Sequence, residues 1–210
     1  MQFKTFKIFV SKIAHEGNRL QKVDITGNPT TKRRFTDMQI LAVLLAVVAV
    51  IVLHEGFPDD FVRDIVVFLG VFVGLFAGIV ISLHDKRKDL LAQYEEKSQI
   101  EKTEIKKIRN YLVQFTGLTA YAILLALILI ILLTVSLLHK GFFELNIWEY
   151  ELKGFHDIDI RAILCFTHVS LLIIHRFLIS YLLVNFFAIT IYAITSYFSY
   201  VLSDYNKIKM

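Results

Sequence analysis

The sequence predicts an all-α integral membrane protein with four transmembrane helices, an inward N-terminus and an inward C-terminus. Four long stretches lack any acid, lysine or arginine: 17 residues between Asp37 and Glu55, 20 between Asp64 and Asp85, 30 between Arg109 and Lys140, and 27 between Arg176 and Asp204. A bilayer core of about 30 Å takes roughly 20 helical residues to cross, and a helix satisfies its own backbone hydrogen bonds there. The composition agrees, since 56% of the residues are hydrophobic.

The basic residues indicate the orientation. Of the 23 lysines and arginines, 18 fall in residues 1–37, 85–110 and 204–210, whereas the loops 55–64 and 140–161 hold one and three. Cytoplasmic segments carry the excess of Lys and Arg in membrane proteins. We therefore expect residues 1–37, 85–110 and the tail 204–210 inside the cell, and both short loops outside.

The N-terminal arm, residues 1–37, begins with an amphipathic pattern. Apolar residues recur at helical spacing, with lysines around the rest of the wheel: Phe3, Phe6, Val10, Ile13 and Ala14. Such a basic amphipathic helix is typical of a segment lying in the membrane interface. The alternative is a helix that packs on the other cytosolic segment and helps to form a ligand surface.

The first transmembrane hairpin, residues 38–84, carries a glycine ridge. Gly70, Gly74 and Gly78 repeat every fourth residue, which gives one helix face without side chains and allows another backbone to approach closely. The ridge fits packing against the small residues of the first span, a seam between subunits, or a pore wall.

Residues 85–110 predict a cytosolic helical segment, because neither Pro nor Gly interrupts them. The chain must fold back within this segment, around 95–99, to re-enter the membrane. Basic clusters lie near the membrane here and before the first span: Lys32, Arg33 and Arg34; Lys86, Arg87 and Lys88; Lys106, Lys107 and Arg109. They fit a solvated hairpin, lipid-headgroup binding, or a vestibule that attracts a polyanion.

The second hairpin, residues 111–203, contains an outer loop at 140–161, an outer-leaflet or re-entrant helix at about 158–175, and a fourth span at about 177–203. Arg161, His168 and His175 recur every seventh residue, and Arg176 follows. This outer polar face fits snorkelling side chains at the interface or a polar ring at a pore mouth. A polar stripe runs through the fourth span: Asn185, Tyr192, Ser196, Ser199 and Ser203. Hydrogen bonding between helices and pore lining explain the stripe equally well.

Enzyme signatures are missing from the sequence. It shows no histidine-rich cluster, no paired carboxylates within a span, no glycine-rich phosphate loop and no metal-ligand spacing. We therefore predict no catalytic residue, no metal and no cofactor. No acid lies within any predicted span, which disfavours a proton-coupled or cation-coupled transporter. What is left is a passive assembly of helices whose pore or packing is the activity.

The layout resembles the small four-span membrane effectors of bacterial anti-phage defence systems, of which the Hailong type is a channel whose cytosolic face binds a short DNA oligomer. The resemblance covers the whole chain as architecture: its size, its inward termini, its basic clusters and its lack of catalytic motifs. It implies a homo-oligomeric ion channel, a tetramer, that depolarises the bacterial inner membrane. The gating signal would be a nucleotide or oligonucleotide made by a cytosolic nucleotidyltransferase and held by the nine basic residues above.

Two other functions stay open on the sequence. One is a non-conducting membrane scaffold that docks a cytosolic enzyme through residues 85–110. The other is a lipid-handling membrane protein that uses Arg161, His168, His175 and Arg176.

Overall fold

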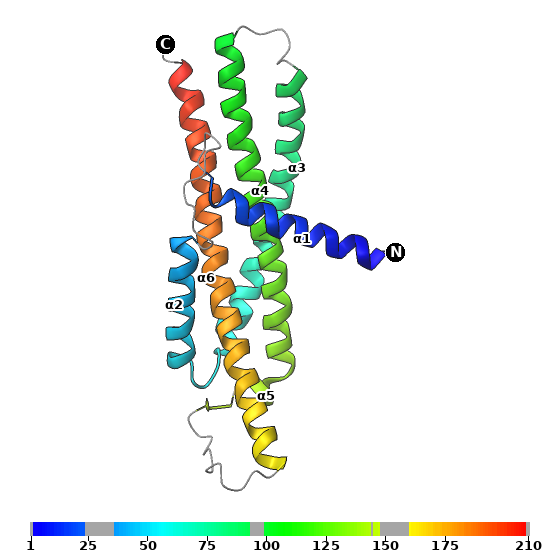
Figure 1. The fold of residues 1–210 in the computed structure, drawn as a ribbon, viewed down its shortest axis with the longest axis vertical. Coiled ribbons are helices and arrows are strands. Elements are labelled where there is room, and N and C mark those ends of the chain that lie inside the picture. Colours follow the sequence, from blue (N-terminus) through cyan, green and yellow to red (C-terminus); the bar gives the residue numbers. More distant parts are fainter. Residues whose placement is uncertain (1, 24–35, 93–98, 144, 148–159, 209–210) are drawn as a thin grey trace. The chain divides into compact units, whose positions relative to one another are not determined.

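The computed structural model describes residues 2–23, 36–92, 99–143, 145–147 and 160–208. Their helices are, in chain order, α1 (Gln2–Leu20), α2 (Asp37–Val52), α3 (Asp59–Ala92), α4 (Gln99–Leu138), α5 (Lys140–Phe143) and α6 (Ile160–Ile208) (Figure 1). The predicted all-helical class is confirmed for this part of the chain.

Three helices contain stretches long and apolar enough to cross a membrane: Asp59–Leu83, Ile105–Leu138 and Ile163–Ser199. These lengths and compositions suit a membrane protein. The predicted first span is shorter, because α2 has 16 residues and so extends for about 24 Å at 1.5 Å per residue. That is less than a typical bilayer core of about 30 Å. Length and composition therefore give three candidate spans among the described residues, and α2 is a shorter apolar helix.

The boundaries can be compared with the predicted ones in two places. The outer helix at 158–175 and the fourth span at 177–203 are joined in α6, which runs for 49 residues without interruption. No Pro or Gly occurs in α6, so nothing in its sequence favours a break at His175. In the predicted cytosolic segment, α3 continues to Ala92 and α4 begins at Gln99, and residues 95–98 of the predicted fold-back at 95–99 lie outside the described residues.

The chain forms two compact units. Unit 1 comprises Met1–Thr36, Val71–Leu127 and Phe186–Met210, and unit 2 comprises Asp37–Gly70 and Ile128–Asn185. In unit 1, the ring of Phe72 meets that of Phe186 edge-on at 4.8 Å. Unit 2 has its own apolar interior, with side chains that are at most 1% exposed: Leu69, Leu129, Leu133, Leu172 and Ile179.

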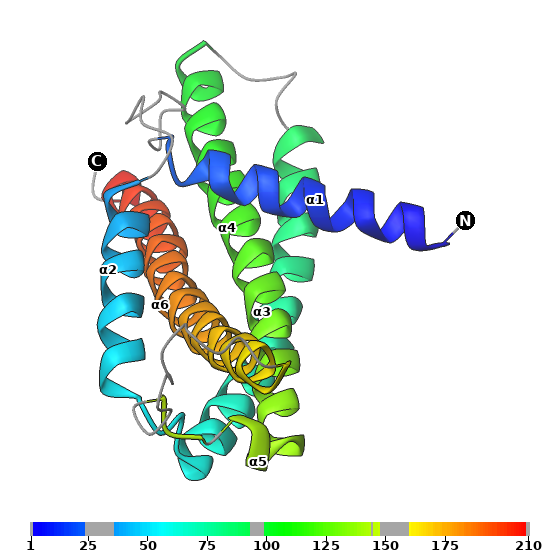
Figure 2. The same cartoon turned by 60° about the horizontal axis from the view of Figure 1, so that its bottom comes forward.

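The C-terminal end of α1 lies across α4 within unit 1 (Figures 1 and 2). Gly17 permits this crossing, because a Cβ at that position would overlap the Tyr121 side chain, including its own Cβ. Leu20 occupies the space beside Gly117 in the same way. The amide of Gln114 then donates hydrogen bonds to the carbonyl oxygens of Leu20 at 3.4 Å and Val23 at 3.0 Å. The end of α1 is thus fixed on α4 by two close approaches and a side-chain amide.

Gly17→Ala is expected to release α1 from α4. The new methyl group meets the Cβ of Tyr121, which cannot rotate away, so the helix has to move at a cost of about 1–3 kcal/mol. This exceeds the gain of about 0.8–1 kcal/mol in helix propensity. Hydrogen exchange of the α1 amides measures the effect and should become faster. Tyr121→Gly in the same chain removes the obstacle, including its Cβ, and should restore slow exchange. Unchanged exchange in Gly17→Ala alone would contradict the close approach.

Candidate functional site

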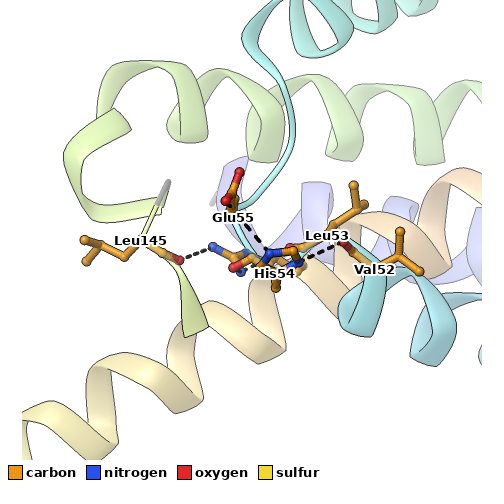
Figure 3. A network of polar contacts seen from close by, with 6 residues as sticks. Val52, Leu53, His54, Glu55 and Leu145 are labelled. Carbon is orange, nitrogen blue, oxygen red and sulfur yellow. Dashed lines mark hydrogen bonds and ion pairs between the residues drawn. The ribbon is translucent and has the colours of Figure 1, made fainter. Parts of the chain in front are cut away.

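Arg176 is a charged side chain held inside unit 2, with only 1% of its surface exposed. Its Nη1 donates hydrogen bonds to the carbonyl oxygens of Leu53 at 3.2 Å and His54 at 2.7 Å. Its Nη2 donates to the carbonyl oxygens of Phe143 at 2.9 Å and Leu145 at 2.7 Å. Figure 3 shows the part of this network at Leu53, His54 and Leu145, around the loop that follows α2. One guanidinium on α6 therefore joins two loops that lie about 90 residues apart in the sequence.

The loop after α2 owes its path to a glycine. Gly56 has a φ of 103°, a conformation that side chains rarely adopt, and its N–H donates to the carbonyl oxygen of Leu53 at 3.0 Å. The carbonyl oxygen of His54 also accepts a hydrogen bond from the N–H of Ile147 at 3.0 Å. The two loops are thus tied to each other as well as to Arg176. We call the guanidinium and its four carbonyl partners the arginine clamp.

The Arg176 guanidinium itself has little free space around it, whereas an open pocket of about 560 Å³ lies over the two loops, lined by residues 55–59, Leu145 and Asn146. A cavity of about 20 Å³ lies beside the guanidinium, lined in part by Ser136, His175 and Arg176. That volume is room for about one water molecule. The Nε of Arg176 has no hydrogen-bond partner within the described residues. Arg176 therefore does not snorkel outward, as one prediction for this polar face assumed, and its arrangement is one that positions loops.

Two histidines of α6 pack on α5. His168 stacks on Phe142 with ring centres 4.0 Å apart, and His175 lies against Phe143 at 4.1 Å. This part of the predicted outer polar face is thus a contact between α6 and α5. The side chain of Arg161, the first member of that face, lies outside what the structure describes.

His175 and Ser136 form the one pairing here that invites a catalytic interpretation. The Nε2 of His175 lies 3.3 Å from the Oγ of Ser136, and the same hydroxyl donates to the carbonyl oxygen of Leu132 at 3.1 Å. When the hydroxyl proton is directed at Leu132, the imidazole Nε2 is the donor to Oγ, since the direction of this bond depends on the tautomer of His175. A histidine that donates to a serine does not activate it as a base would. The pair joins α4 to α6 within unit 2.

The glycine ridge of α3 faces open space. Gly70, Gly74 and Gly78 are exposed, and a Cβ added at any of them would meet no atom within 4 Å. Ala42 and Ala46 of α2 are fully buried, so the small residues of the predicted first span are covered elsewhere. Packing of the ridge within one chain has no contact to support it among the described residues. A seam between subunits and a pore wall stay as predictions.

The polar stripe of α6 does not form one continuous surface. Asn185 and Ser196 are buried, at 3% and 5% exposure, whereas Tyr192 is 38% exposed. Ser199 is half-buried, and the side chain of Ser203 lies outside the described part. The two buried members therefore belong to helix packing in this chain, and Tyr192 stands at the edge of that packing.

The structure describes the side chains of one of the three basic clusters. Lys106 and Lys107 are exposed and Arg109 is half-buried, close to the start of the apolar stretch of α4 at Ile105. The other predicted polyanion contacts are not placed by described side chains: Lys86, Arg87 and Lys88 in α3, and Lys32, Arg33 and Arg34, which precede α2.

The arginine clamp is the feature that the sequence reasoning missed. Arg176 is the only acid, lysine or arginine between residues 162 and 203, and that isolation was the available signal. A lone charge in a long apolar helix must find polar partners inside the protein. Its partners here are main-chain carbonyl groups, which every residue carries, so no motif could name them.

No three side chains among His, Cys, Asp and Glu lie close enough together to hold a metal ion in the portion that the structure describes. Comparisons of the chain with protein-family models, with curated proteins and with solved structures find no match. The functional interpretation therefore rests on the residues and contacts described above.

Proposed function

We propose that the chain is one subunit of a homo-oligomeric ion channel, or membrane-depolarising effector, of the bacterial inner membrane. In this proposal the chain crosses the bilayer four times and keeps both termini in the cytosol. A nucleotide or oligonucleotide bound at the basic cytosolic residues controls the path. The observation that carries the proposal is the uncovered glycine ridge on α3, a helix long and apolar enough to span the membrane.

The ridge supports self-association. A glycine inside a helix costs about 1 kcal/mol relative to alanine, so three in register need a compensating contact. Close approach of a second helix supplies such a contact in membranes, because backbones then pack without intervening side chains. Exposed apolar residues accompany the ridge on the same helix, among them Val67 and Ile81, each 67% exposed. A second copy of the chain is the partner that a homo-oligomer would place there.

The packing within each unit supports a path between copies rather than through one chain. In unit 2, large apolar side chains fill the interior, and the cavity beside Arg176 has a volume of about 20 Å³. In unit 1, Phe72 and Phe186 meet in the interior at 4.8 Å. Neither unit offers an ion a wide route along these residues. Subunits arranged around an axis would form one.

In this proposal, Lys106 and Lys107, near the start of the apolar stretch of α4, control the path. Lys106 and Lys107 are exposed beside the first residues of a candidate span. A polyanion is attracted to such a position, and its affinity falls with salt because bound counterions are released on binding.

Replacing both lysines with glutamine is expected to weaken binding of a short single-stranded DNA oligomer to the reconstituted protein. If each lysine contacts one phosphate, the slope of log affinity against log salt should fall by about 1.4 in magnitude. Fluorescence anisotropy of a labelled oligomer measures the slope, and ion flux from the same liposomes measures conduction. Arg63→Gln, a change of an exposed side chain near the N-terminal end of the apolar stretch of α3, is the matched control. It should leave both the salt slope and the ion flux unchanged.

The outcomes separate the candidate functions. Oligomer-dependent flux that is lost in the double variant supports the gated channel. Absence of flux with and without oligomer rejects conduction and favours the non-conducting scaffold.

A further inference from the structure

The apolar face of α1 is covered at one end and uncovered at the other. Residues at helical spacing form this face, here called the arm face: Phe6, Phe9, Val10, Ile13, Gly17 and Leu20. Its C-terminal members, Gly17 and Leu20, are buried against Tyr121 and Gly117 of α4. Its N-terminal members are not, since Phe6 is 63% exposed and Phe9 62% exposed. The same face thus continues beyond its partner helix.

The side of α1 opposite the arm face is basic. Lys4, Lys7 and Lys12 are exposed there, together with Ile8 and Ser11. Glu16 is the single acid of α1, and its carboxylate accepts hydrogen bonds from Arg19 Nε at 2.9 Å and Nη2 at 2.5 Å. These bonds hold the pKa of Glu16 below its usual value, so it is ionised and paired at neutral pH. Four bases against one acid leave α1 with a charge of +3.

The place where α1 is attached points to the membrane. Its C-terminal end rests on residues 114–121 of α4, which lie within the apolar stretch Ile105–Leu138, 5 to 12 residues beyond Arg109. If the bilayer core takes the last roughly 20 residues of this stretch, up to Leu138, this level of α4 lies near the boundary between lipid headgroups and acyl chains. Large exposed aromatic residues beside lysines suit that boundary. A second protein copy would cover the aromatic residues but would leave the lysines without a function.

We propose that the N-terminal half of α1 binds the anionic lipid surface of the leaflet at which it emerges. Phe6 and Phe9 enter the edge of the acyl chains, and Lys4, Lys7 and Lys12 remain among the phosphates. The attachment at Gly17 and Leu20 holds the helix at the correct depth. This interaction goes beyond the proposed channel and holds whether or not the chain conducts ions.

Tryptophan fluorescence in the full-length reconstituted protein tests this placement. Trp148 is the single tryptophan, so Trp148→Phe provides a silent background. Phe9→Trp places the reporter on the arm face, and Ser11→Trp places it roughly 160° around the same helix, as the matched control. The vesicles contain phosphatidylcholine with or without phosphatidylglycerol, and lipids brominated on their acyl chains serve as quenchers.

In vesicles with phosphatidylglycerol, Phe9→Trp should be quenched roughly threefold more than Ser11→Trp and should emit at shorter wavelength. Quenching of Phe9→Trp should weaken in pure phosphatidylcholine and at high salt, because the attraction of the lysines is screened. Changing Lys4, Lys7 and Lys12 to glutamine should have the same effect as removing the anionic lipid.

Three results would overturn the proposal. Equal quenching at both positions would show that the arm face is not the side turned to lipid. Equal quenching of Phe9→Trp with and without phosphatidylglycerol would show that an anionic lipid surface is not the partner of the arm face. Protection of Phe9→Trp from both brominated lipid and aqueous iodide would identify a protein partner instead. If Trp148→Phe does not fold, spin labels at Phe9→Cys and Ser11→Cys in a Cys165→Ser background measure the same depths.

Discussion

Replacing Arg176 with alanine is expected to produce the largest loss of stability of any single change in this chain. Four carbonyl groups lose their donors at once, and the loops after α2 and α5 lose the side chain that joins them. Removing one partner of a buried charged interaction costs roughly 3–5 kcal/mol. For a chain of this size that corresponds to a fall in melting temperature of roughly 6–20 °C. Thermal unfolding of the detergent-solubilised protein, followed by intrinsic fluorescence, measures it.

Two further variants test the physical reason. Arg176→Lys keeps the charge, but its donors radiate from one nitrogen and cannot reproduce the planar fork that reaches two loops, so it should restore only part of the stability. Arg63→Ala, whose side chain is 63% exposed, is the matched control and should change stability by less than about 0.5 kcal/mol. If the melting temperature of Arg176→Ala equals that of the native protein, the arginine clamp does not hold the loops.

Gly74→Leu is expected to abolish self-association while leaving the single chain folded. A Cβ at position 74 meets no atom of its own protomer within 4 Å, and leucine is the better helix former by about 0.8 kcal/mol, so the protomer should be as stable or more stable. A helix packed on the ridge, by contrast, would be forced away by several ångströms, and packing in membranes depends on that closeness. Light scattering coupled to size-exclusion chromatography in detergent measures the mass of the complex.

Gly74→Leu should therefore keep or raise the stability of the protomer while it removes the oligomer, and this combination makes the experiment decisive. Leu75→Trp is the control, because it adds bulk to α3 at an exposed position 100° around the helix from Gly74. It should leave the oligomer intact. An oligomer that persists in Gly74→Leu would remove the ridge from the subunit seam and, with it, the main support for the proposed channel.

The long helices could be predicted because charge marks their limits. Asp59 and Asp60 precede the apolar stretch of α3 and Lys106 and Lys107 open that of α4, and apolar residues dominate between the charged flanks. The sequence could not show where α2 stops. Its apolar run continues to His54, but α2 ends at Val52 because the following carbonyls turn toward Arg176.

The sequence was a weaker guide to which single residues contact one another. A Cβ at Gly70, Gly74 or Gly78, the glycines that looked suited to close packing, would meet no atom within 4 Å, whereas Gly17 and Gly117 permit close approaches that no pattern announced. A small residue indicates that something can come near, but only the tertiary arrangement decides what does. The same limit applies to Arg176, whose isolation was visible and whose partners were not.

The clamp has a consequence for how this protein can vary. Arg176 touches Leu53, His54, Phe143 and Leu145 through their carbonyl oxygens, and every amino acid, proline included, carries such an oxygen. Side-chain identity at these four positions is therefore not constrained by the contact. The two loops can diversify, and present new chemistry to their surroundings, for as long as their main-chain course and the one arginine persist.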